Sequence, residues 1–203
     1  MKSYLIVILI GYLLGSSSMS FYVSKLKKVE IRDKGSKNLG ASNTMMVLGW
    51  KYGVLVGIHD IGKSILAVLL AKYFFPDLEL AGFIAGTASV LGHIFPFYLK
   101  FKGGKGFASY FGMTLALNWK LALVIALLVV LVTLITDYIV VGTTLTITAV
   151  PLFYGIATKG LIVPLILLIG TIVIAYKHRM NYVRIYKGTE IGLRSANRGD
   201  HRA

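Results

Sequence analysis

The stretch WKLALVIALLVVLVTLIT, residues 119–136, decides the fold class of this chain. After Lys120 it contains only apolar residues and two threonines, and its length approaches the roughly 20 residues with which a helix crosses a bilayer. Similar apolar segments recur along the chain, so the sequence predicts an all-α integral membrane protein with about seven transmembrane helices. The predicted spans are residues 4–23, 53–74, 79–98, 107–117, 119–136, 138–157 and 160–176.

The composition agrees with this class of protein. Of the 203 residues, 56% are hydrophobic and only 15% are charged, which is less charge than soluble domains carry. We expect one membrane-embedded domain over residues 1–203, because the loops between the spans are too short to fold by themselves. We also expect the first apolar segment to be retained as a span and not removed as a signal peptide.

The residue types that bind metals are sparse. The chain has no cysteine, which excludes disulfides and thiolate catalysis. The four histidines are scattered along the sequence and form no obvious metal-binding pattern: His59, His93, His178 and His201. We therefore predict no metal and no cofactor.

The placement of positive charge predicts the orientation in the membrane. Of the 22 Lys and Arg residues, 17 lie in three segments: 7 in residues 25–51, 3 in residues 100–105 and 7 in residues 177–203. Such segments stay on the cytoplasmic side. Seven spans with the N-terminus outside place all three segments inside, and so does a five-span arrangement that merges residues 119–157 differently. We expect no nucleic acid partner, because most of the remaining chain is predicted to lie in lipid.

Residues 100–109, KFKGGKGFAS, combine three glycines with three lysines between two apolar segments. Glycines allow backbone N–H groups to converge on an anion, and lysine adds positive charge. A helix that begins at Phe107 would direct its positive end at the same point. We call residues 100–106 the glycine loop, and expect it to bind phosphate through Lys105 and the backbone of Gly103, Gly104 and Gly106.

Residues 35–43, GSKNLGASN, form a second polar segment, here called the amide loop. Its hydroxyl and amide side chains suit hydrogen bonding to an oxyanion or a polyol. An ordinary cytoplasmic loop is the alternative interpretation. The basic run just before it, KLKKVEIRDKG at residues 25–35, indicates anchorage to anionic membrane lipid.

A third polar segment follows the last predicted span. His178 and Asn181 are three residues apart and share one face if the helix continues to them. Arg184 and the sequence KGTE, residues 187–190, come next. Taken alone, this segment is more typical of the positive flank of a span than of a site.

Residues 57–64, GIHDIGKS, match the phosphate-binding loop pattern of nucleotide-binding proteins. That pattern needs a strand before it and a helix after it, whereas here it lies inside an apolar run. Asp60 and Lys63 are three apart, and a helix would let them pair and neutralise each other. We interpret them as an ion pair that supports a neighbouring site; a proton or ion path is the functional alternative.

The three polar segments, in this order, resemble the three cytoplasmic motifs of the PlsY family, the bacterial acyl-phosphate:glycerol-3-phosphate acyltransferases. That family's pattern runs approximately GSGNPGATN, GHxFPxxxxFKGGKGxAT and HxxNxxRLxxGTExK. The corresponding segments here are GSKNLGASN, GHIFPFYLKFKGGKGFAS at residues 92–109 and HRMNYVRIYKGTE at residues 178–190. The second matches most closely, and DIGKS at residues 60–64 corresponds to the family's DxxKG element.

The resemblance implies a multi-pass enzyme of the bacterial cell membrane with its active site facing the cytoplasm. It would transfer an acyl group from acyl phosphate to the sn-1 hydroxyl of glycerol 3-phosphate, giving lysophosphatidate and phosphate for phospholipid synthesis. The implied partners are these two substrates, membrane lipid and a soluble enzyme that makes acyl phosphate.

The resemblance also assigns roles to residues. The expected catalytic residues are His178, Asn181 and Ser36; whether His178 is a base or only orients substrate stays open, because the substrate phosphate could take the proton. The expected substrate or phosphate ligands are Lys105, Gly103, Gly104, Gly106, Asn38, Asn43 and Lys37. The expected supporting residues are His93, which would orient the glycine loop, with Asp60, Lys63 and Glu190.

The chain departs from the family's pattern at four positions. Lys37 replaces a glycine, Leu39 a proline, Met46 an arginine and Gly192 a lysine. Two expected cations are missing and one is gained. A non-catalytic paralogue that binds phosphorylated metabolites is therefore one alternative. A small-solute transporter, suggested by the charges within a span, is another.

Overall fold

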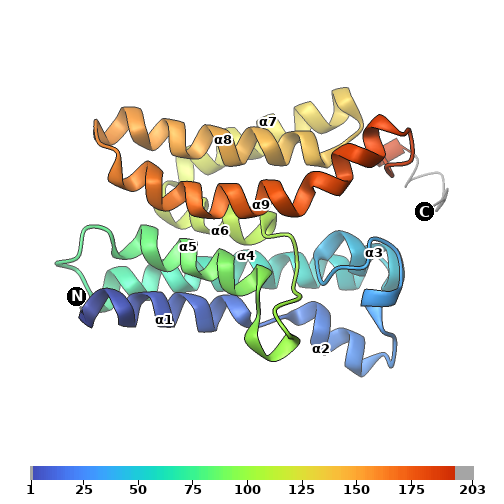
Figure 1. Ribbon diagram of the computed structural model, residues 1–203, viewed down its shortest axis with the longest axis horizontal. Coiled ribbons are helices and arrows are strands. Elements are labelled where there is room, and N and C mark those ends of the chain that lie inside the picture. Colours follow the sequence, from blue (N-terminus) through green and yellow to red (C-terminus); the bar gives the residue numbers. More distant parts are fainter. Residues whose placement is uncertain (1, 195–203) are drawn as a thin grey trace. The chain divides into compact units, whose positions relative to one another are not determined.

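The computed structural model describes residues 2–194, and every regular element in that range is a helix. The chain falls into two compact units, residues 1–117 and residues 118–203. The first unit contains α1 (Lys2–Ser16), α2 (Met19–Leu26), the 3-10 turn η1 (Ile31–Asp33), α3 (Ala41–Leu48), α4 (Trp50–Phe74), α5 (Ala81–Ile94), the 3-10 turn η2 (Phe97–Leu99) and α6 (Phe107–Leu117) (Figure 1). The second contains α7 (Trp119–Thr136), α8 (Ile139–Thr158) and α9 (Ile162–Tyr186).

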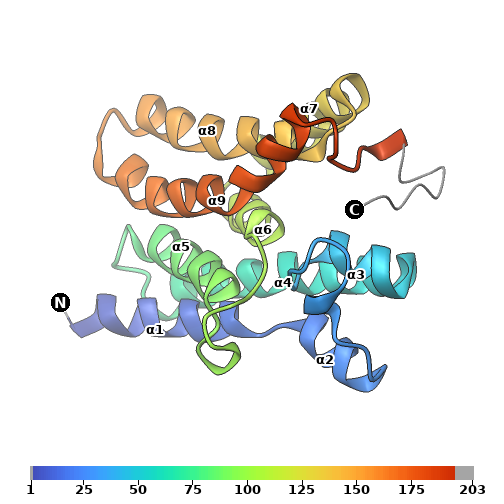
Figure 2. The ribbon, with the colours of Figure 1, turned by 45° about the vertical axis from the view of Figure 1, so that its right-hand side comes forward.

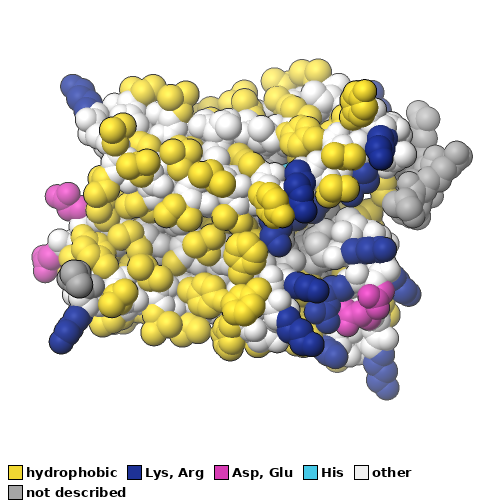
Figure 3. Space-filling model, viewed as in Figure 1, with side chains coloured by type: hydrophobic (Ala, Val, Ile, Leu, Met, Phe, Trp, Pro, Cys, Tyr) yellow, Lys and Arg dark blue, Asp and Glu magenta, His cyan; other side chains and the backbone are white. Residues whose placement is uncertain are grey.

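Within residues 2–194, six helical segments are long and apolar enough to cross a membrane. They are Lys2–Leu26, Trp50–Phe74, Ala81–Leu99, Trp119–Thr136, Ile139–Thr158 and Ile162–Tyr186. The predicted all-α membrane class is confirmed, and each of the seven predicted spans has a helix at its position. With 11 residues, α6 is too short to cross alone, so the number of crossings stays a prediction. Figure 3 shows hydrophobic side chains along the helices of the first unit, and Lys and Arg side chains gathered around α2 and α3.

Glycines bring α1 into close contact with α5, and both ribbon views show the two helices side by side (Figures 1 and 2). A Cβ atom placed on Gly11 would overlap the backbone of Ala85, and one placed on Gly15 would overlap the backbone of Ser89. Apolar helices in lipid gain little hydrophobic energy by associating, so small residues that let backbones approach stabilise their contacts. The close packing of α1 against α5 therefore depends on Gly11 and Gly15.

The first predicted span is interrupted at Ser17 and Ser18, between α1 and α2. Ser18 caps the N-terminus of α2 with its side-chain oxygen. The carbonyl oxygens at the break accept hydrogen bonds from distant side chains: that of Ser16 from the Tyr98 hydroxyl at 2.9 Å, and that of Ser17 from Lys63 Nζ at 2.7 Å. A broken helix at membrane depth needs such internal partners, because lipid offers none.

In the second unit, Pro151 lies inside α8. Proline has no N–H, so the carbonyl of Ile147, four residues earlier, loses its partner within the helix. Thr171 of α9 donates its hydroxyl to that carbonyl at 2.8 Å. The bond satisfies the backbone group and joins α8 to α9.

We expect Gly15→Ala to lower the thermal unfolding midpoint of the purified protein in detergent, because the added methyl would overlap the Ser89 backbone. Overpacking of this kind costs about 1–3 kcal/mol. Gly62→Ala is the matched control: it also lies in a membrane helix, but a Cβ there meets nothing within 4 Å. Equal shifts in the two variants would contradict the close α1–α5 contact.

Candidate active site

Asn43, at the start of α3, holds the amide loop together from inside. Its side chain is fully buried. Its Oδ1 accepts from the Ser36 amide at 2.7 Å, and its Nδ2 donates to the carbonyl oxygens of Ile31 at 3.1 Å and Asn38 at 2.9 Å. Both amide hydrogens and the side-chain oxygen are thus engaged within the protein. This bonding changes the role that we propose for Asn43, from a substrate ligand to the residue that shapes the loop.

Ser36 and Asn38 lie together at the surface of the amide loop. Asn38 Nδ2 donates to Ser36 Oγ at 2.7 Å, and both residues are half-buried. Lys37 between them is exposed and has a φ of +56°, the left-handed region that favours glycine. A lysine there costs roughly 1–2 kcal/mol, which gives a physical reason for the glycine in the family's pattern. The structure therefore brings Ser36, predicted as catalytic, to one surface with Lys37 and Asn38, predicted as ligands.

The amides of Gly103 and Gly104 point into the protein. Gly103 N–H donates to the Ile94 carbonyl at 3.1 Å, and Gly104 N–H donates to the His93 carbonyl at 3.2 Å. A Cβ on Gly104 would overlap the His93 imidazole and lie 2.8 Å from the Leu39 carbonyl. These glycines permit close packing, and their N–H groups are bound to α5 instead of facing a phosphate. Two of the backbone N–H groups that we expected to bind phosphate are therefore already bonded within the protein.

Lys105 and Gly106 stand directly before α6, which begins at Phe107 as the sequence predicts. Gly106 is buried and has a φ of +98°, and its carbonyl accepts the first helical bond of α6, from the Tyr110 amide at 2.9 Å. Lys105 is half-buried. The position beside a helix N-terminus favours an anion, so Lys105 keeps its proposed role as a phosphate ligand.

A buried ion pair lies behind the glycine loop. In α4, Lys63 Nζ is 2.8 Å from Asp60 Oδ1, which confirms the pairing that their spacing predicts. His93 Nδ1 of α5 lies 2.9 Å from Lys63 Nζ and 3.3 Å from Asp60 Oδ1. Because the His93 carbonyl holds the Gly104 amide, this group of charges supports one end of the glycine loop.

His59 is a member of this group that sequence reasoning missed. Its Nε2 lies 3.0 Å from Ser17 Oγ, and its Nδ1 lies 3.6 Å from Asp60 Oδ1. We call Ser17, His59, Asp60, Lys63 and His93 the Lys63 cluster. The signal was available, because His59 directly precedes Asp60 within an apolar segment. All of GIHDIGKS lies inside α4, so the strand–loop–helix setting of a nucleotide-binding loop is absent there.

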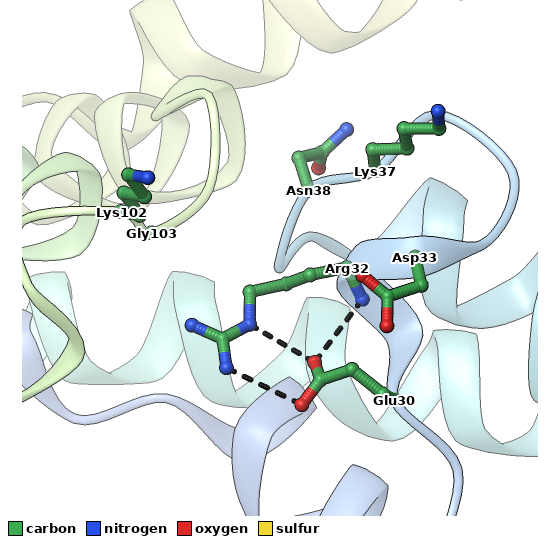
Figure 4. A pocket seen from close by; sticks show the side chains of 7 residues that line it. All are labelled: Glu30, Arg32, Asp33, Lys37, Asn38, Lys102 and Gly103. Atoms are coloured by element: carbon green, nitrogen blue, oxygen red, sulfur yellow. Dashed lines mark hydrogen bonds and ion pairs between the residues drawn. The ribbon is translucent and has the colours of Figure 1, made fainter.

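A hollow of about 520 Å³ opens on the first unit beside the amide loop (Figure 4). Its lining residues are Glu30, Arg32, Asp33, Lys37, Asn38, Lys102 and Gly103, and we call it the Arg32 pocket. Arg32 Nε donates to Glu30 Oε1 at 2.9 Å, and its Nη2 donates to Glu30 Oε2 at 3.3 Å. These bonds hold the pKa of the Glu30 carboxyl below its ordinary value and raise that of Arg32.

The pocket adds residues that the sequence did not single out. Arg32 and Lys102 belong to basic runs whose ordinary role is to face membrane lipid or water, and charge alone does not separate them from their neighbours. Asn38, Lys37 and Gly103 were predicted as ligands, and the pocket brings them together.

The third polar segment forms a local network in the second unit. As the spacing predicts, α9 continues through His178 and Asn181, and both side chains are buried. His178 Nδ1 lies 2.9 Å from the Ile174 carbonyl. Asn181 Nδ2 and Arg184 Nε each donate to one oxygen of Glu190, at 2.5 Å. Glu190, predicted as a supporting residue, thus pairs with Arg184 in the turn after α9.

Across residues 2–194, no group of three or more His, Cys, Asp or Glu side chains could hold a metal ion. The donors that are present suit another chemistry. Lysine, hydroxyl, amide and imidazole groups gather at the ends of apolar helices, which is typical of an integral membrane protein that handles an oxyanion beside lipid.

Comparison with known proteins agrees with this class and makes it specific. The family model described as "Glycerol-3-phosphate acyltransferase" matches residues 5–188. The chain therefore belongs to the glycerol-3-phosphate acyltransferase family of enzymes. It is 38% identical over 202 residues to "Glycerol-3-phosphate acyltransferase 1" of Oceanobacillus iheyensis, covering 95% of this chain and 96% of that one. It is 37% identical to the Clostridioides difficile glycerol-3-phosphate acyltransferase, covering 93% of this chain and 94% of the relative.

Two solved structures are also similar. The crystal structure of PlsY, an integral membrane glycerol 3-phosphate acyltransferase, in its glycerol 3-phosphate form has a TM-score of 0.88 and 33% identity, covering 96% of this chain and 98% of that one. The lysophosphatidic acid form has a TM-score of 0.83 and 34% identity, covering 94% and 95%. The resemblance seen in the three motifs thus extends over nearly the whole chain.

We expect Asn43→Ala to destabilise the protein strongly, because three backbone groups would lose their partner inside the protein. Each buried polar group left unsatisfied costs about 1–3 kcal/mol. Thermal unfolding in detergent measures the loss. Ser42→Ala, at the exposed neighbouring position, is the control and should leave the midpoint within a degree or so of wild type. A small, equal effect of both changes would contradict the organising role of Asn43.

We expect Asp60→Asn and Lys63→Met to be destabilising singly, by about 3–5 kcal/mol each, because each leaves a buried charge without its partner. The double variant should lose clearly less than the sum of the two. Unfolding midpoints of the four proteins form a double-mutant cycle. Strict additivity would show that the two charges do not depend on each other.

Proposed function

We propose that this protein transfers an acyl group from an acyl phosphate to the sn-1 hydroxyl of glycerol 3-phosphate, releasing lysophosphatidate and inorganic phosphate. The observation that carries the proposal is the family match over residues 5–188. The two similar crystal structures support it further, since one is described with glycerol 3-phosphate and the other with lysophosphatidic acid. The same match supports one functional domain, because it runs across the boundary between the two compact units.

The residues suit this reaction. An acyl phosphate is already activated, so the enzyme needs only to align the acceptor hydroxyl and stabilise the charge that develops. The hydroxyl oxygen attacks the acyl carbon, the bond from that carbon to the phosphate oxygen breaks, and phosphate leaves. We assign Lys105 to hold phosphate, and Ser36 with Asn38 to bind substrate oxygens.

We assign His178 and Asn181 to the reacting hydroxyl. A carbonyl only accepts, so the 2.9 Å contact with Ile174 places a proton on His178 Nδ1 and, in the neutral ring, a lone pair on Nε2. That tautomer suits a base that accepts the hydroxyl proton. Transfer to the leaving phosphate is the second route, and it predicts that His178→Gln retains part of the activity.

We further propose seven crossings with the N-terminus outside and the site facing the cytoplasm of a bacterial cell. The support is the positive charge of residues 25–51, 100–105 and 177–203, which this arrangement places on one side. Membrane lipid and a soluble enzyme that makes acyl phosphate are the proposed partners. No cofactor or metal enters the reaction as proposed.

Purified protein in detergent should form lysophosphatidate and phosphate from palmitoyl phosphate and glycerol 3-phosphate. We expect Lys105→Ala and His178→Ala each to lower kcat/KM by about 100-fold or more, because each removes a group that contacts the reacting phosphate or hydroxyl. Phosphate release measures the rate, and Lys120→Ala, an exposed charge outside the three motifs, is the control.

A folded preparation that binds glycerol 3-phosphate but shows no turnover with any acyl phosphate would contradict the proposal. That result would favour a non-catalytic binding protein, the alternative suggested by Met46 and Gly192. Flux of glycerol 3-phosphate into proteoliposomes without acyl transfer would favour a transporter.

A further inference from the structure

The Arg32 pocket contains a charge pattern that the residues assigned to acyl transfer do not explain. Three cations line it, Arg32, Lys37 and Lys102, together with two carboxylates, Glu30 and Asp33. Lys105, the proposed phosphate ligand of the reaction, is not among the lining residues. The pocket therefore offers a second set of phosphate-binding groups on the first unit, with hydrogen-bond acceptors beside them.

Glu30 occupies the position of an internal anion. Its two carboxylate oxygens accept from Nε and Nη2 of Arg32, a two-point contact that matches how a guanidinium binds a phosphate monoester. Figure 4 shows the Arg32 side chain reaching across the pocket toward the segment that carries Lys102 and Gly103, with the Glu30 carboxylate against it. A phosphate that enters the pocket would find the Arg32 side chain already extended. It would compete with the Glu30 carboxylate for the guanidinium group.

The other two cations are available to such a ligand. Within the part of the chain that the structure describes, no carboxylate lies within ion-pair distance of Lys37 or Lys102, and both side chains are exposed. Lys37 is held with a φ of +56°, a conformation that costs energy for any residue with a Cβ. Lys37 thus adds a cation to the lining of the pocket at a position where glycine would adopt the same backbone conformation without strain.

We propose that the Arg32 pocket is an outer subsite that binds a phosphate monoester carrying hydroxyl groups. Arg32, Lys37 and Lys102 bind the phosphate oxygens, Glu30 and Asp33 accept hydrogen bonds from the hydroxyls, and Asn38 can accept from a hydroxyl or donate to it. The volume of about 520 Å³ is large enough to admit a glycerol phosphate with room for water. That this ligand is the substrate glycerol 3-phosphate rests on the proposed acyl transfer. That the pocket binds a phosphate monoester does not depend on that reaction.

The test measures binding by calorimetry in a Lys105→Ala background, so that the proposed catalytic ligand is removed and failure of catalysis does not affect the result. The full-length protein in detergent is titrated with glycerol 3-phosphate and with inorganic phosphate. Arg32→Gln should weaken binding by about 10-fold or more, because a charge-assisted two-point contact is lost.

Glu30→Gln should strengthen phosphate binding, because the competing anion is removed. Lys34→Gln, an equal loss of charge two residues from Arg32 and outside the pocket, should change it less than twofold.

Arg32→Gln and Glu30→Gln are expected to change the affinity for phosphate in opposite directions, which distinguishes a binding role of the pair from a structural one. If the pair only stabilises η1, both variants should weaken binding or neither should change it, and either result would overturn the proposal. Absence of any phosphate binding in the Lys105→Ala protein would overturn it as well. In the active protein, Arg32→Gln should raise KM for glycerol 3-phosphate about 10-fold with kcat unchanged; a fall in kcat alone would contradict a capture role.

A phosphate monoester at this surface can come from water or from a lipid headgroup. Adding phosphatidate to nanodiscs distinguishes the sources. If it lowers the affinity for glycerol 3-phosphate in the Arg32-containing protein but not in Arg32→Gln, the pocket takes the lipid phosphate. If affinity is unchanged while inorganic phosphate still competes, the pocket takes the soluble monoester.

Discussion

The ammonium group of Lys63 is the constraint on which the first unit depends. It lies in a helix apolar enough to cross a membrane, where an unpaired charge would be costly. Its three contacts reach three separate parts of the chain: the Ser17 carbonyl at the break between α1 and α2, Asp60 one turn away in α4, and His93 in α5. One buried cation thereby satisfies a broken helix, neutralises a carboxylate and fixes an imidazole. An apolar side chain in its place would remove the donor to the Ser17 carbonyl and the lysine partner of Asp60.

The position of the glycine loop follows from this arrangement. His93 is fixed on one side by Lys63 and Asp60, and on the other it meets Gly104 through both its ring and its carbonyl oxygen. The Leu39 carbonyl also lies against Gly104, so the amide loop meets the same point. Asn43 then sets the shape of the amide loop from within. The two polar loops of the first unit are therefore held by buried hydrogen bonds, while their exposed cations remain at the surface.

The sequence predicts what depends on local pattern. Apolar runs of the right length fix the helices, because lipid demands that each span satisfy its own backbone. Spacing also predicts the Asp60–Lys63 pair and the shared face of His178 and Asn181. What depends on distant partners is not predictable in this way. The break after α1 is tolerated only because Tyr98 and Lys63 reach its carbonyls.

Arg32 shows a second limit. Within the run KLKKVEIRDKG it is one cation among several, and only the fold separates the residue that binds Glu30 and lines a pocket from those that face lipid or water. Asn43 shows the same for amides: Asn38 on the same loop is half-buried, whereas Asn43 is fully buried and bonded on every polar atom of its side chain. A residue type indicates which bonds are possible, and burial decides which are made.

The departures from the family's pattern acquire a physical meaning at two positions. Lys37 occupies a left-handed turn that glycine would fill without strain, so the lysine carries an energetic cost, and it lines the same pocket as Arg32 and Lys102. At position 192, a Cβ would overlap the Asp137 carboxylate, and that residue binds the amides of Leu193 and Arg194 through its carbonyl and carboxylate oxygens. Glycine there lets the segment after α9 lie against the end of α7. The family's lysine is thus absent at a position where glycine allows this segment to pack against α7. Its absence is therefore a change in packing as well as the loss of one cation.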